Sequence, residues 1–377
     1  MKIIITNASL LWGGNENWAF TIAKLLPGRH HTVKLILKEG SEVSERAAKL
    51  GIPVIPVTRF GGDFELPNLL RLYRIFLREQ PDVVILTHWK DYWVCGLTSW
   101  LAQVPVRLLR LSILRRVQDN LKYRLIYRQF VNKLVVNSRE VELSTRASAK
   151  WLEDTTIHVL YNGIAVPDPH SRWIHQKKAK ELRKEWGIPD DALVFGACVN
   201  FFYRKRLDLI ISALADLRDE LPNAHVFLAG KGEVQDKLEA QAQQLGLGDR
   251  VHFPGYFQDV TPLYYLFDVY VISSQQESMT YVGMQALALG CPVLATDCGG
   301  IRELLDNGRC GIIVPVNDLT ALREGMLTLA THPKMRSRFV ELGRERFEKY
   351  FTENRMVSNL EAILQGQPQP YPMPVQF

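Results

Sequence analysis

The stretch SSQQESMTYVGMQALALGCPV, residues 273–293, indicates an α/β fold. An apolar run at residues 269–272 precedes it and is expected to be a buried strand, and a helix is expected from about Met279 to Leu289. Gly290 then ends this helix and Pro292 opens the next strand. In open α/β sheets, ligands bind beyond the carboxyl ends of the strands, and a helix N-terminus there can bind phosphate. The sequence therefore predicts a ligand site between the strand at residues 269–272 and the helix that follows it.

The same alternation of short apolar runs and longer amphipathic ones extends over nearly the whole chain. It predicts two doubly wound α/β domains in tandem, each a parallel sheet covered by helices on both faces. The expected strands are residues 2–6, 33–37, 83–87 and 134–136 in the first domain, and 193–197, 226–228, 251–253, 269–272, 293–296 and 311–314 in the second. The pattern breaks at residues 162–169, where Gly and two prolines cluster, and again at residues 187–190. We place the domain junction in this region.

The composition is that of a globular protein with enough apolar material for two cores. Of the 377 residues, 47% are apolar and 23% are charged, which argues against disorder. The five cysteines are widely spaced without a C-x-x-C pair, so we expect neither a disulfide framework nor a metal site, and a reducing compartment fits best. The N-terminus lacks the features of a signal peptide, and no stretch reaches about 18 apolar residues. These features predict a cytoplasmic protein without a transmembrane helix.

Two strand-to-helix junctions in the first domain carry candidate ligand-binding residues. Gly13-Gly14-Asn15-Glu16 follows the first strand, where glycines allow close approach of a ligand and a helix start offers free N–H groups. The same residues also fit a tight turn with Asn15 as helix N-cap, and they do not match the G-x-G-x-x-G of dinucleotide dehydrogenases. His88 ends another strand, where it could hydrogen-bond a substrate, although a lone His is more often structural.

Two further candidates lie in the second domain. Arg204, Lys205 and Arg206 occupy a strand-to-helix loop, where they could neutralise a diphosphate or form a solvated basic turn. Glu277 precedes the helix of the opening stretch, and Gln285 lies eight residues later, about two turns along and on a similar face. One could hold sugar hydroxyls and the other ribose hydroxyls. The alternative is an ordinary acidic residue near a helix start and a surface glutamine.

Together these residues resemble the retaining glycosyltransferases of family 4, the glycosyl transferases group 1, over nearly the whole chain. The donor domain of that family carries Glu, seven residues and Glu, followed by Ala-x-x-x-Gly-x-Pro-Val. Here Glu277, seven residues and Gln285 are followed by the matching residues 286–293. Further matching motifs are Tyr161-Asn162-Gly163-Ile164, Leu228-Ala229-Gly230-Lys231-Gly232, Phe253-Pro254-Gly255-Tyr256, Gly299-Gly300-Ile301-Arg302-Glu303 and Gly13-Gly14-Asn15-Glu16.

The resemblance implies the GT-B fold, in which two Rossmann-like domains face each other across a cleft. Residues 1–165 would form the acceptor-binding domain, residues 190–350 the nucleotide-sugar donor-binding domain, and residues 351–365 a C-terminal helix that crosses back to the first domain. The implied reaction moves a hexosyl group from a UDP-sugar, or less readily a GDP-sugar, to a hydroxyl of a glycan or lipid-linked acceptor in cell-surface polysaccharide or glycolipid synthesis. The anomeric configuration would be retained by front-face attack, with the leaving phosphate accepting the acceptor proton. Neither a metal nor a cofactor is expected, since the nucleotide sugar is a co-substrate and no D-x-D triplet is present.

The resemblance also implies roles for individual residues. Glu277 would contact the donor hexose hydroxyls, Lys205 would meet the donor diphosphate, and His88 would face the transferred sugar, which makes these three the predicted catalytic residues. The predicted donor-binding residues are Gly14, Asn200, Arg204, Arg206, Gly230, Tyr256, Phe257, Ser278, Met279, Thr280, Tyr281, Val282 and Gln285. Backbone groups of Gly14 and of residues 280–282 would approach the phosphates, and the turn at residues 255–257 would lie near the base.

Two positions depart from the family pattern. Asn200 stands where the family usually has Arg and cannot neutralise a diphosphate, so Arg204 or Arg206 would have to compensate. Gln285 stands where the family usually has Glu, which replaces a charged hydrogen bond of about 1.5–3 kcal/mol with a neutral one of about 0.5–1.5 kcal/mol. Two alternatives therefore stay open: a sugar-nucleotide epimerase of GT-B-like fold, and a catalytically weakened sugar-nucleotide-binding subunit.

A basic block accounts for the positive charge of the chain. Residues 101–150 hold 11 Lys and Arg against 3 Asp and Glu, whereas the whole chain carries a formal charge of +6. The block, interleaved with apolar residues, comprises Arg107, Arg110, Arg115, Arg116, Lys122, Arg124 and Arg128. One interpretation is a peripheral face on the inner side of an anionic membrane, near a lipid-linked acceptor, and another is a solvated helix of the acceptor domain. Nucleic-acid binding usually needs a longer basic stripe and is not expected.

Overall fold

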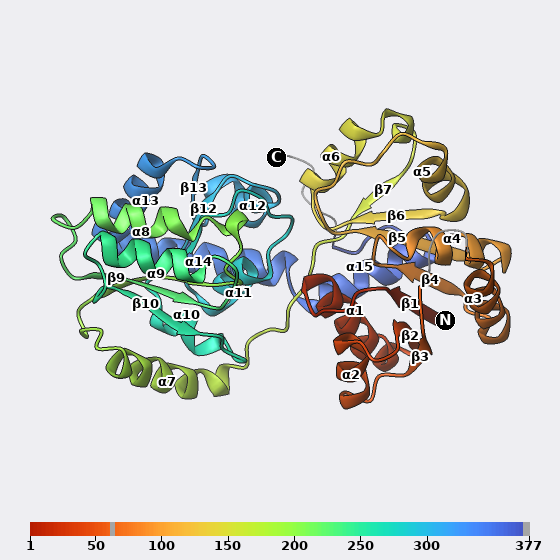
Figure 1. The fold of residues 1–377 in the computed structure, drawn as a ribbon, viewed down its shortest axis with the longest axis horizontal. Coiled ribbons are helices and arrows are strands. Elements are labelled where there is room, and N and C mark those ends of the chain that lie inside the picture. Colours follow the sequence, from red (N-terminus) through yellow and green to blue (C-terminus); the bar gives the residue numbers. More distant parts are fainter. Residues whose placement is uncertain (61–64, 372–377) are drawn as a thin grey trace. The chain divides into compact units, whose positions relative to one another are not determined.

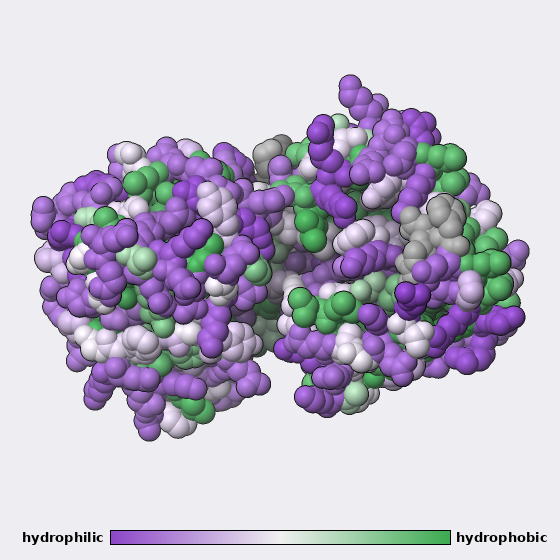
Figure 2. Space-filling view, viewed as in Figure 1, coloured by the Kyte–Doolittle hydropathy of each residue, from purple (hydrophilic) through white to green (hydrophobic). Residues whose placement is uncertain are grey.

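The computed structural model describes residues 1–60 and 65–371, which fold into two compact α/β units (Figure 1). Unit 1 contains Met1–Gly163 and the C-terminal helix that begins at Glu353, and unit 2 contains Ile164–Thr352. In both units every strand pairs parallel to its neighbours, as the sequence predicts. Figure 2 shows a mainly hydrophilic surface in which hydrophobic side chains are scattered. None of the described helices combines the length and apolar character needed to span a membrane.

The sheet of unit 1 has seven strands in the order β3-β2-β1-β4-β5-β6-β7. Their bounds are β1 (Lys2–Asn7), β2 (Thr32–Lys38), β3 (Val54–Val57), β4 (Val83–Leu86), β5 (Val106–Leu111), β6 (Lys133–Val136) and β7 (Ile157–Val159). The four predicted strands are confirmed, whereas β3, β5 and β7 were not predicted. Each of these three lacks a continuous apolar run, because β3 contains Pro56, β5 contains two arginines and His158 interrupts the three residues of β7.

Helices cover this sheet on two faces, each with its own core. Alternate residues of β1 enter different clusters, with Ile4 in one and Ile3 and Ile5 in the other, as expected for a strand buried on both sides. The helices of unit 1 are α1 (Gly14–Leu25), α2 (Glu42–Lys49), α3 (Leu66–Glu79), α4 (Tyr92–Leu101), α5 (Leu121–Leu125), α6 (Arg139–Ser148) and α15 (Glu353–Gln365).

Helix α15 belongs to unit 1 although it follows unit 2 in the sequence. Its buried residues Met356, Leu360 and Ile363 enter the same core cluster as Trp18. The carboxylate of Glu361 in α15 forms an ion pair with the Arg29 guanidinium at 2.7 Å, and its other oxygen lies 2.8 Å from His31 Nε2. The last helix is therefore held to the N-terminal sheet by apolar packing and by charged contacts at its edge.

The sheet of unit 2 has six strands in the order β10-β9-β8-β11-β12-β13, one at each of the six predicted segments. Their bounds are β8 (Leu193–Cys198), β9 (Ala224–Ala229), β10 (Val251–Gly255), β11 (Val269–Ile272), β12 (Val293–Thr296) and β13 (Ile312–Val314). Four of them, β8, β9, β11 and β12, are almost entirely buried and mostly apolar, which is why the sequence pattern finds them. Because β8 and β12 flank β11, the loops that follow these three strands emerge side by side at one edge.

The helices of unit 2 complete the doubly wound arrangement. They are α7 (Arg172–Glu185), α8 (Leu207–Asp216), α9 (Gln235–Gln244), α10 (Thr261–Leu266), α11 (Tyr281–Leu289), α12 (Ile301–Leu304), α13 (Leu319–Thr331) and α14 (Pro333–Tyr350). Unit 2 begins before residue 190, the predicted start of the second domain, because α7 packs against α10. Helix α11 begins at Tyr281 and ends at Gly290, whose φ of 76° is the left-handed conformation expected of a C-terminal glycine.

Candidate functional site

The candidate site of unit 2 lies where three loops meet at the carboxyl edge of its sheet. The loop after β8 is joined to the loop after β11, because the Gln275 amide donates a 2.8 Å bond to the Arg204 carbonyl and the Ser273 hydroxyl donates one of 2.8 Å to the Lys205 carbonyl. The loop after β12 joins them through the Gly300 amide, which donates a 2.6 Å bond to the Ser278 carbonyl. The topology thus brings together segments that lie far apart in the sequence.

Lys205 and Glu277 form an ion pair at the centre of these loops. Their side chains are only 11% and 10% exposed, so the pair is held in a largely desolvated position. The Ser274 hydroxyl donates a 2.7 Å bond to the same carboxylate oxygen, and the Arg204 guanidinium lies 4.0 Å from the other oxygen. The sequence predicted both members of the pair as site residues, and the structure brings them into contact.

The backbone around Glu277 is fixed by a glycine in the next loop. Gly299 has a φ of 56°, and a Cβ atom at this position would lie 2.0 Å from the Glu277 carbonyl oxygen. A side chain is therefore excluded both by the backbone conformation and by contact with the site. The motif Gly299-Gly300 was singled out in the sequence, and its packing against Glu277 gives a physical reason for it.

Helix α11 begins beside this pair. Thr280 is its N-cap residue but makes no side-chain capping bond, and Met279 and Thr280 are buried at the turn, whereas Ser278 is half-buried. The first turn of a helix presents N–H groups and a partial positive charge. A cationic Lys205 and the positive end of α11, whose first residues are Tyr281 and Val282, can therefore act together on an anionic ligand.

Gln285 lies in α11, and its side chain makes a hydrogen bond to Tyr264 of the same unit. The hydroxyl of Tyr264, which is fully buried, lies 3.1 Å from the Gln285 Oε1 atom and 3.1 Å from the Val282 carbonyl oxygen. Glu277 precedes α11 by several residues, so the expected helical spacing between Glu277 and Gln285 is wrong. The loop, not the helix, sets the position of Glu277.

Three of the predicted donor-binding residues in the loop after β8 have different surroundings. Asn200 is exposed, and the Arg204 guanidinium donates a 3.3 Å bond to the Gln276 carbonyl beside Glu277. The Arg206 guanidinium instead pairs with Asp208 at 2.8 Å and also binds Asn317. The hydrogen bond to Asp208 raises the pKa of Arg206. Of the two arginines expected to compensate for Asn200, only Arg204 is directed toward Glu277.

Gly230 and the turn after β10 form the other side of this edge. Gly230 has a φ of 144°, and a Cβ atom there would lie 1.9 Å from the Val199 carbonyl oxygen. The loops after β8 and β9 therefore contact each other through backbone atoms. The Gly230 amide donates a 2.7 Å bond to the Gly255 carbonyl. Tyr256 follows with its side chain 66% exposed, and Phe257 is half-buried, which leaves an aromatic surface available to a planar ligand.

In unit 1, Asn15 organises the carboxyl edge of the sheet, and its expected alternative role as a helix N-cap is wrong. Helix α1 begins at Gly14, which is exposed, with Gly13 in the N-cap position. The Asn15 side chain donates a 2.5 Å bond to the Thr87 carbonyl and accepts one of 2.5 Å from Arg110. Asn15 therefore ties the first turn of α1 to the ends of β4 and β5.

His88 follows β4 and is half-buried. Burial, together with the nearby charges of Lys90 and Arg115, lowers the pKa of His88 to about 4. The imidazole is therefore neutral at neutral pH, and its Nδ1 atom accepts a 3.3 Å bond from the Lys90 amide, which leaves the proton on Nε2. Burial likewise raises the pKa of the neighbouring Asp91 well above its usual range.

The basic block, expected as one surface, is divided between different environments. Arg110 is 1% exposed in β5, donates a 2.7 Å bond to Asn162, and lies 4.3 Å from the ring centre of Trp18. Arg107 donates to the Phe130 carbonyl at 2.7 Å, and Arg124 pairs with Asp119 at 2.7 Å. Arg110 therefore cannot belong to a membrane face, because strand β5 carries it into the unit.

The sequence missed several residues that hold these sites together. Ser273 and Ser274 bind Lys205 and Glu277, and their signal was available, since polar residues at the end of a buried strand mark the ligand edge. The interaction of Arg110 with Asn15 and Asn162 had no local signal, because it links positions from three distant segments.

Comparisons with known proteins agree with this architecture. The family model described as Glycosyl transferases group 1 matches residues 178–346, and the one described as Glycosyltransferase Family 4 matches residues 12–166. Among solved structures, Anabaena Alr3699/HepE in complex with UDP superposes with a TM-score of 0.85 at 20% identity, over 97% of this chain and 100% of that chain. A glycosyltransferase from Rickettsia africae gives a TM-score of 0.86 at 18% identity, over 97% of this chain and 98% of that chain. At these identities the likeness shows the fold.

Curated relatives match at higher identity over shorter lengths. The lipopolysaccharide core biosynthesis glycosyltransferase LpsE of Rhizobium meliloti is 28% identical over 49% of this chain and 54% of its own length. The N-acetyl-alpha-D-glucosaminyl L-malate synthase of Bacillus anthracis is 28% identical over 55% of this chain and 53% of its own length. The chain thus spans about half the length of the curated relatives it matches. Since one family model covers most of unit 1, the other most of unit 2, and both units have the expected fold, the chain belongs to the GT-B glycosyltransferases of family 4.

Proposed function

We propose that this chain transfers a hexosyl group from a UDP-sugar to a hydroxyl of a glycan or lipid-linked acceptor, with retention of the anomeric configuration. The observation that carries the proposal is the Lys205–Glu277 ion pair beside the first turn of α11. Such a site offers positive charge to a diphosphate and a carboxylate to sugar hydroxyls. The solved structures of Anabaena HepE with UDP and with UDP-glucose support UDP as the nucleotide.

Lys205 would stabilise the charge that develops on the leaving diphosphate. A cation about 4 Å from a phosphate oxygen contributes on the order of 4 kcal/mol at an effective dielectric constant of about 20. The first turn of α11 adds N–H groups and its partial positive charge on the same side. Glu277 keeps Lys205 in position and would accept hydrogen bonds from the donor hexose, a role for which its second oxygen, 4.0 Å from Arg204, remains suited.

Unit 1 would supply the acceptor side. His88 is neutral at neutral pH because its pKa is about 4, so it would donate a hydrogen bond from Nε2 and not act as a cation. The acceptor proton would pass to the leaving phosphate, and no basic side chain is then required. The name of the relative LpsE, a lipopolysaccharide core biosynthesis enzyme, supports a cell-surface glycan as the acceptor class.

The decisive assay is turnover of a panel of UDP- and GDP-sugars, with product configuration read by NMR. We expect UDP release that depends on the acceptor and a product with the donor's anomeric configuration. Lys205→Ala should reduce turnover by at least about a hundredfold, as removal of one transition-state donor typically does. Lys237→Ala, an exposed position on α9, is the matched control and should retain wild-type turnover.

The alternatives give different results in the same assay. An epimerase would interconvert or hydrolyse the sugar nucleotide without any acceptor. A weakened binding subunit would bind UDP-sugars, seen as a thermal shift, without release of UDP. Binding at about 100 times the dissociation constant should add about 2.7 kcal/mol of stability. If no nucleotide sugar shifts the melting temperature, the donor-binding proposal fails altogether.

A further inference from the structure

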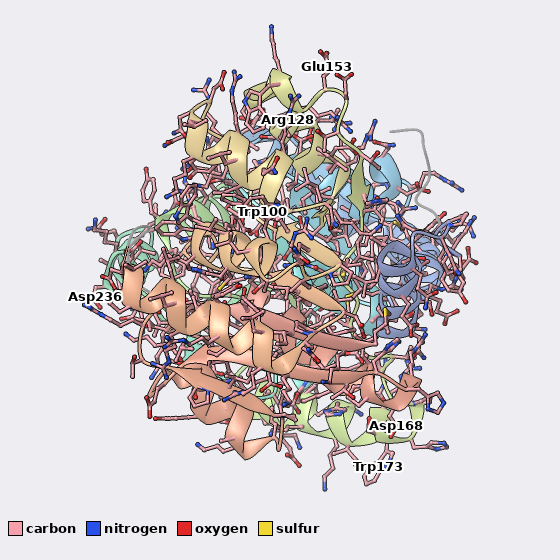
Figure 3. The ribbon with its side chains drawn as sticks, turned by 90° about the vertical axis from the view of Figure 1, so that its right-hand side faces the viewer. Trp100, Arg128, Glu153, Asp168, Trp173 and Asp236 are labelled. Carbon is pink, nitrogen blue, oxygen red and sulfur yellow. The ribbon has the colours of Figure 1, made fainter. Side chains whose placement is uncertain are left out.

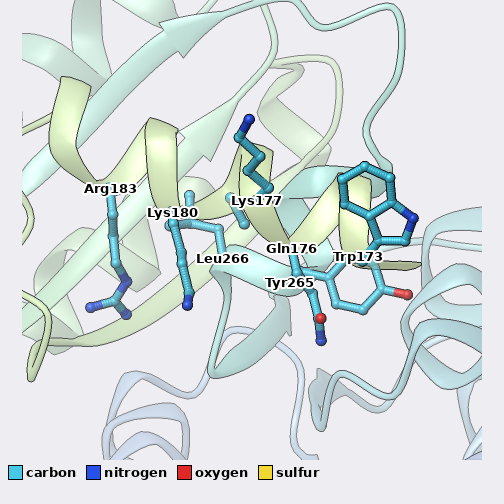
Figure 4. A pocket seen from close by; sticks show the side chains of 8 residues that line it. Trp173, Gln176, Lys177, Lys180, Arg183, Tyr265 and Leu266 are labelled. Carbon is cyan, nitrogen blue, oxygen red and sulfur yellow. The ribbon is translucent and has the colours of Figure 1, made fainter. Parts of the chain in front are cut away.

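Helix α7 and the groove beside it form a feature that the proposed reaction does not use. A pocket of about 490 Å³ lies between α7 and α10, outside the Lys205–Glu277 site. Figure 4 shows Trp173 and Tyr265 at one end of this pocket and Arg183 at the other, with Lys180 between them. The lining thus combines aromatic rings with cations, a pairing suited to an amphiphilic anion.

The exposed face of α7 carries an ordered stripe. Ala179 and Leu182 are buried, which fixes the side of the helix that packs on unit 2. Trp173, Lys177, Lys180 and Lys184 follow one another at intervals of four, three and four residues, so they lie along one line on the outer side. Trp173 is 65% exposed and projects into solvent (Figure 3).

The charge of this helix is strongly asymmetric. It contains six Lys and Arg against two Glu. Arg183 is engaged by its own unit, since it donates to the Ala192 carbonyl at 2.9 Å and lies 3.5 Å from Asp268. Lys177 lies 3.9 Å from Glu181, and both side chains remain well exposed, so this pair is weak. The lysine stripe therefore presents a net positive charge to solvent.

Two exposed apolar residues lie near the N-terminal end of the stripe but off its line, since successive residues of a helix are about 100° apart. Ile174 is 49% exposed next to Trp173, and Val166, in the segment before α7, is 59% exposed. Exposed Trp and Ile side chains beside a row of lysines fit the boundary between lipid headgroups and acyl chains, although the apolar face of this helix packs on its own unit. The long lysine side chains can reach lipid phosphates while their stems cover apolar surface.

We propose that α7 docks unit 2 onto an anionic phospholipid surface. Trp173 and Ile174 enter the headgroup region, Lys177, Lys180 and Lys184 lie against lipid phosphates, and one headgroup occupies the mouth of the pocket beside Tyr265. Charge complementarity selects this partner, since each lysine near an anionic membrane favours binding about fivefold. This surface differs from the basic block of unit 1, whose Arg110 is buried and whose Arg124 is paired.

Vesicle flotation of the whole chain tests the proposal independently of transferase activity. Wild-type protein should float with vesicles containing phosphatidylglycerol and not with pure phosphatidylcholine vesicles. Lys177→Glu/Lys180→Glu/Lys184→Glu should weaken binding on the order of a hundredfold, which is three lysine contributions together. Trp173→Ala should weaken binding at unchanged charge. Unaltered thermal melts would show that each variant is folded.

Two charge-reversal variants outside α7 serve as controls for the flotation experiment. Lys237→Glu/Lys334→Glu/Lys349→Glu makes the same change of charge at exposed positions on α9 and α14, and should retain binding. Arg115→Glu/Arg116→Glu/Lys122→Glu tests the basic block and should also retain it. The proposal is overturned if the wild type does not bind anionic vesicles, if the α7 variant binds as well as the wild type, or if only the block variant loses binding. Binding to duplex DNA but not to vesicles, with the same lysines required, would also overturn it.

Discussion

The ammonium group of Lys205 and the carboxylate of Glu277 meet across 72 residues of sequence. Each belongs to the loop that follows its own strand, β8 for Lys205 and β11 for Glu277, and these strands are neighbours in the sheet. Ser274 adds a hydrogen bond to the same carboxylate, and Gly299 packs its backbone against the Glu277 carbonyl. The pair is therefore part of the architecture of unit 2, and perturbing it should affect both stability and ligand binding.

The first prediction concerns the stability of this pair. Lys205→Met should lower the free energy of unfolding by about 1.5–3 kcal/mol, because Glu277 loses its charged partner in a position of low exposure. Adding Glu277→Gln should recover part of this loss, since the carboxylate no longer requires a cation. Urea unfolding of the wild type, both single variants and the double variant measures the coupling. Strictly additive effects would show that the two side chains do not interact.

The second prediction concerns Gln285, the position where the family usually has glutamate. Gln285→Glu should tighten UDP binding about fivefold, because a charged hydrogen bond to ribose exceeds a neutral one by about 1 kcal/mol. The Tyr264 hydroxyl, 3.1 Å away, can donate to the new carboxylate. Isothermal titration with UDP measures the effect. Gln244→Glu, which adds the same charge at an exposed position on α9, should leave the affinity unchanged; an equal gain there would argue against a ribose contact.

The third prediction compares two glycines of left-handed conformation. Gly299→Ala would place its Cβ atom 2.0 Å from the Glu277 carbonyl oxygen, so the loop must move and UDP affinity should fall at least about tenfold. Gly308→Ala, at a φ of 91° with no atom within 4 Å of the new Cβ, should cost roughly 1–2 kcal/mol of stability without a change of affinity. Titration calorimetry and thermal melts separate the two effects. Equal affinities in both variants would contradict the role assigned to Gly299.

The fourth prediction uses the buried pair His225 and His252, whose ring nitrogens lie 2.9 Å apart. Burial and the neighbouring imidazole lower the pKa of His252 to about 4, and burial also lowers the pKa of His225. Between pH 6.5 and about 4, the unfolded chain binds more protons than the folded one, so stability should fall as the pH falls. His225→Asn/His252→Gln should flatten this part of the pH profile of urea midpoints. A variant that keeps the wild-type slope would assign the slope to other groups.

The sequence predicted the second unit better than the first. Four strands of unit 2, β8, β9, β11 and β12, are almost entirely buried and mostly apolar, whereas β5 of unit 1 carries Arg107 and Arg110, which a local pattern assigns to the surface. Arg110 is buried because Asn15 and Asn162, from distant segments, bind its guanidinium. No local rule contains that information, so the basic block was read as one surface.

The candidate site was likewise predictable where residues adjoin apolar strands, and unpredictable where distant segments meet. Lys205 and Glu277 could be placed at the ligand edge, since each follows a recognisable buried strand. The sequence also placed Glu277 ahead of the helix, as the structure has it. The separate engagement of Arg206 by Asp208 depends on a backbone turn that apolar spacing does not encode. Residue types were therefore predictable at this site, but their partners were not.

The edge of unit 2 that contains Lys205 and Glu277 is expected to bind the diphosphate of a UDP-sugar. The most direct test is the dissociation constant of UDP-glucose for the wild type and for Lys205→Met, measured by titration calorimetry at equal ionic strength, with Lys237→Met as control. We expect saturable binding that Lys205→Met weakens at least about a hundredfold and Lys237→Met leaves unchanged. Equal affinity of the wild type and Lys205→Met would contradict this expectation.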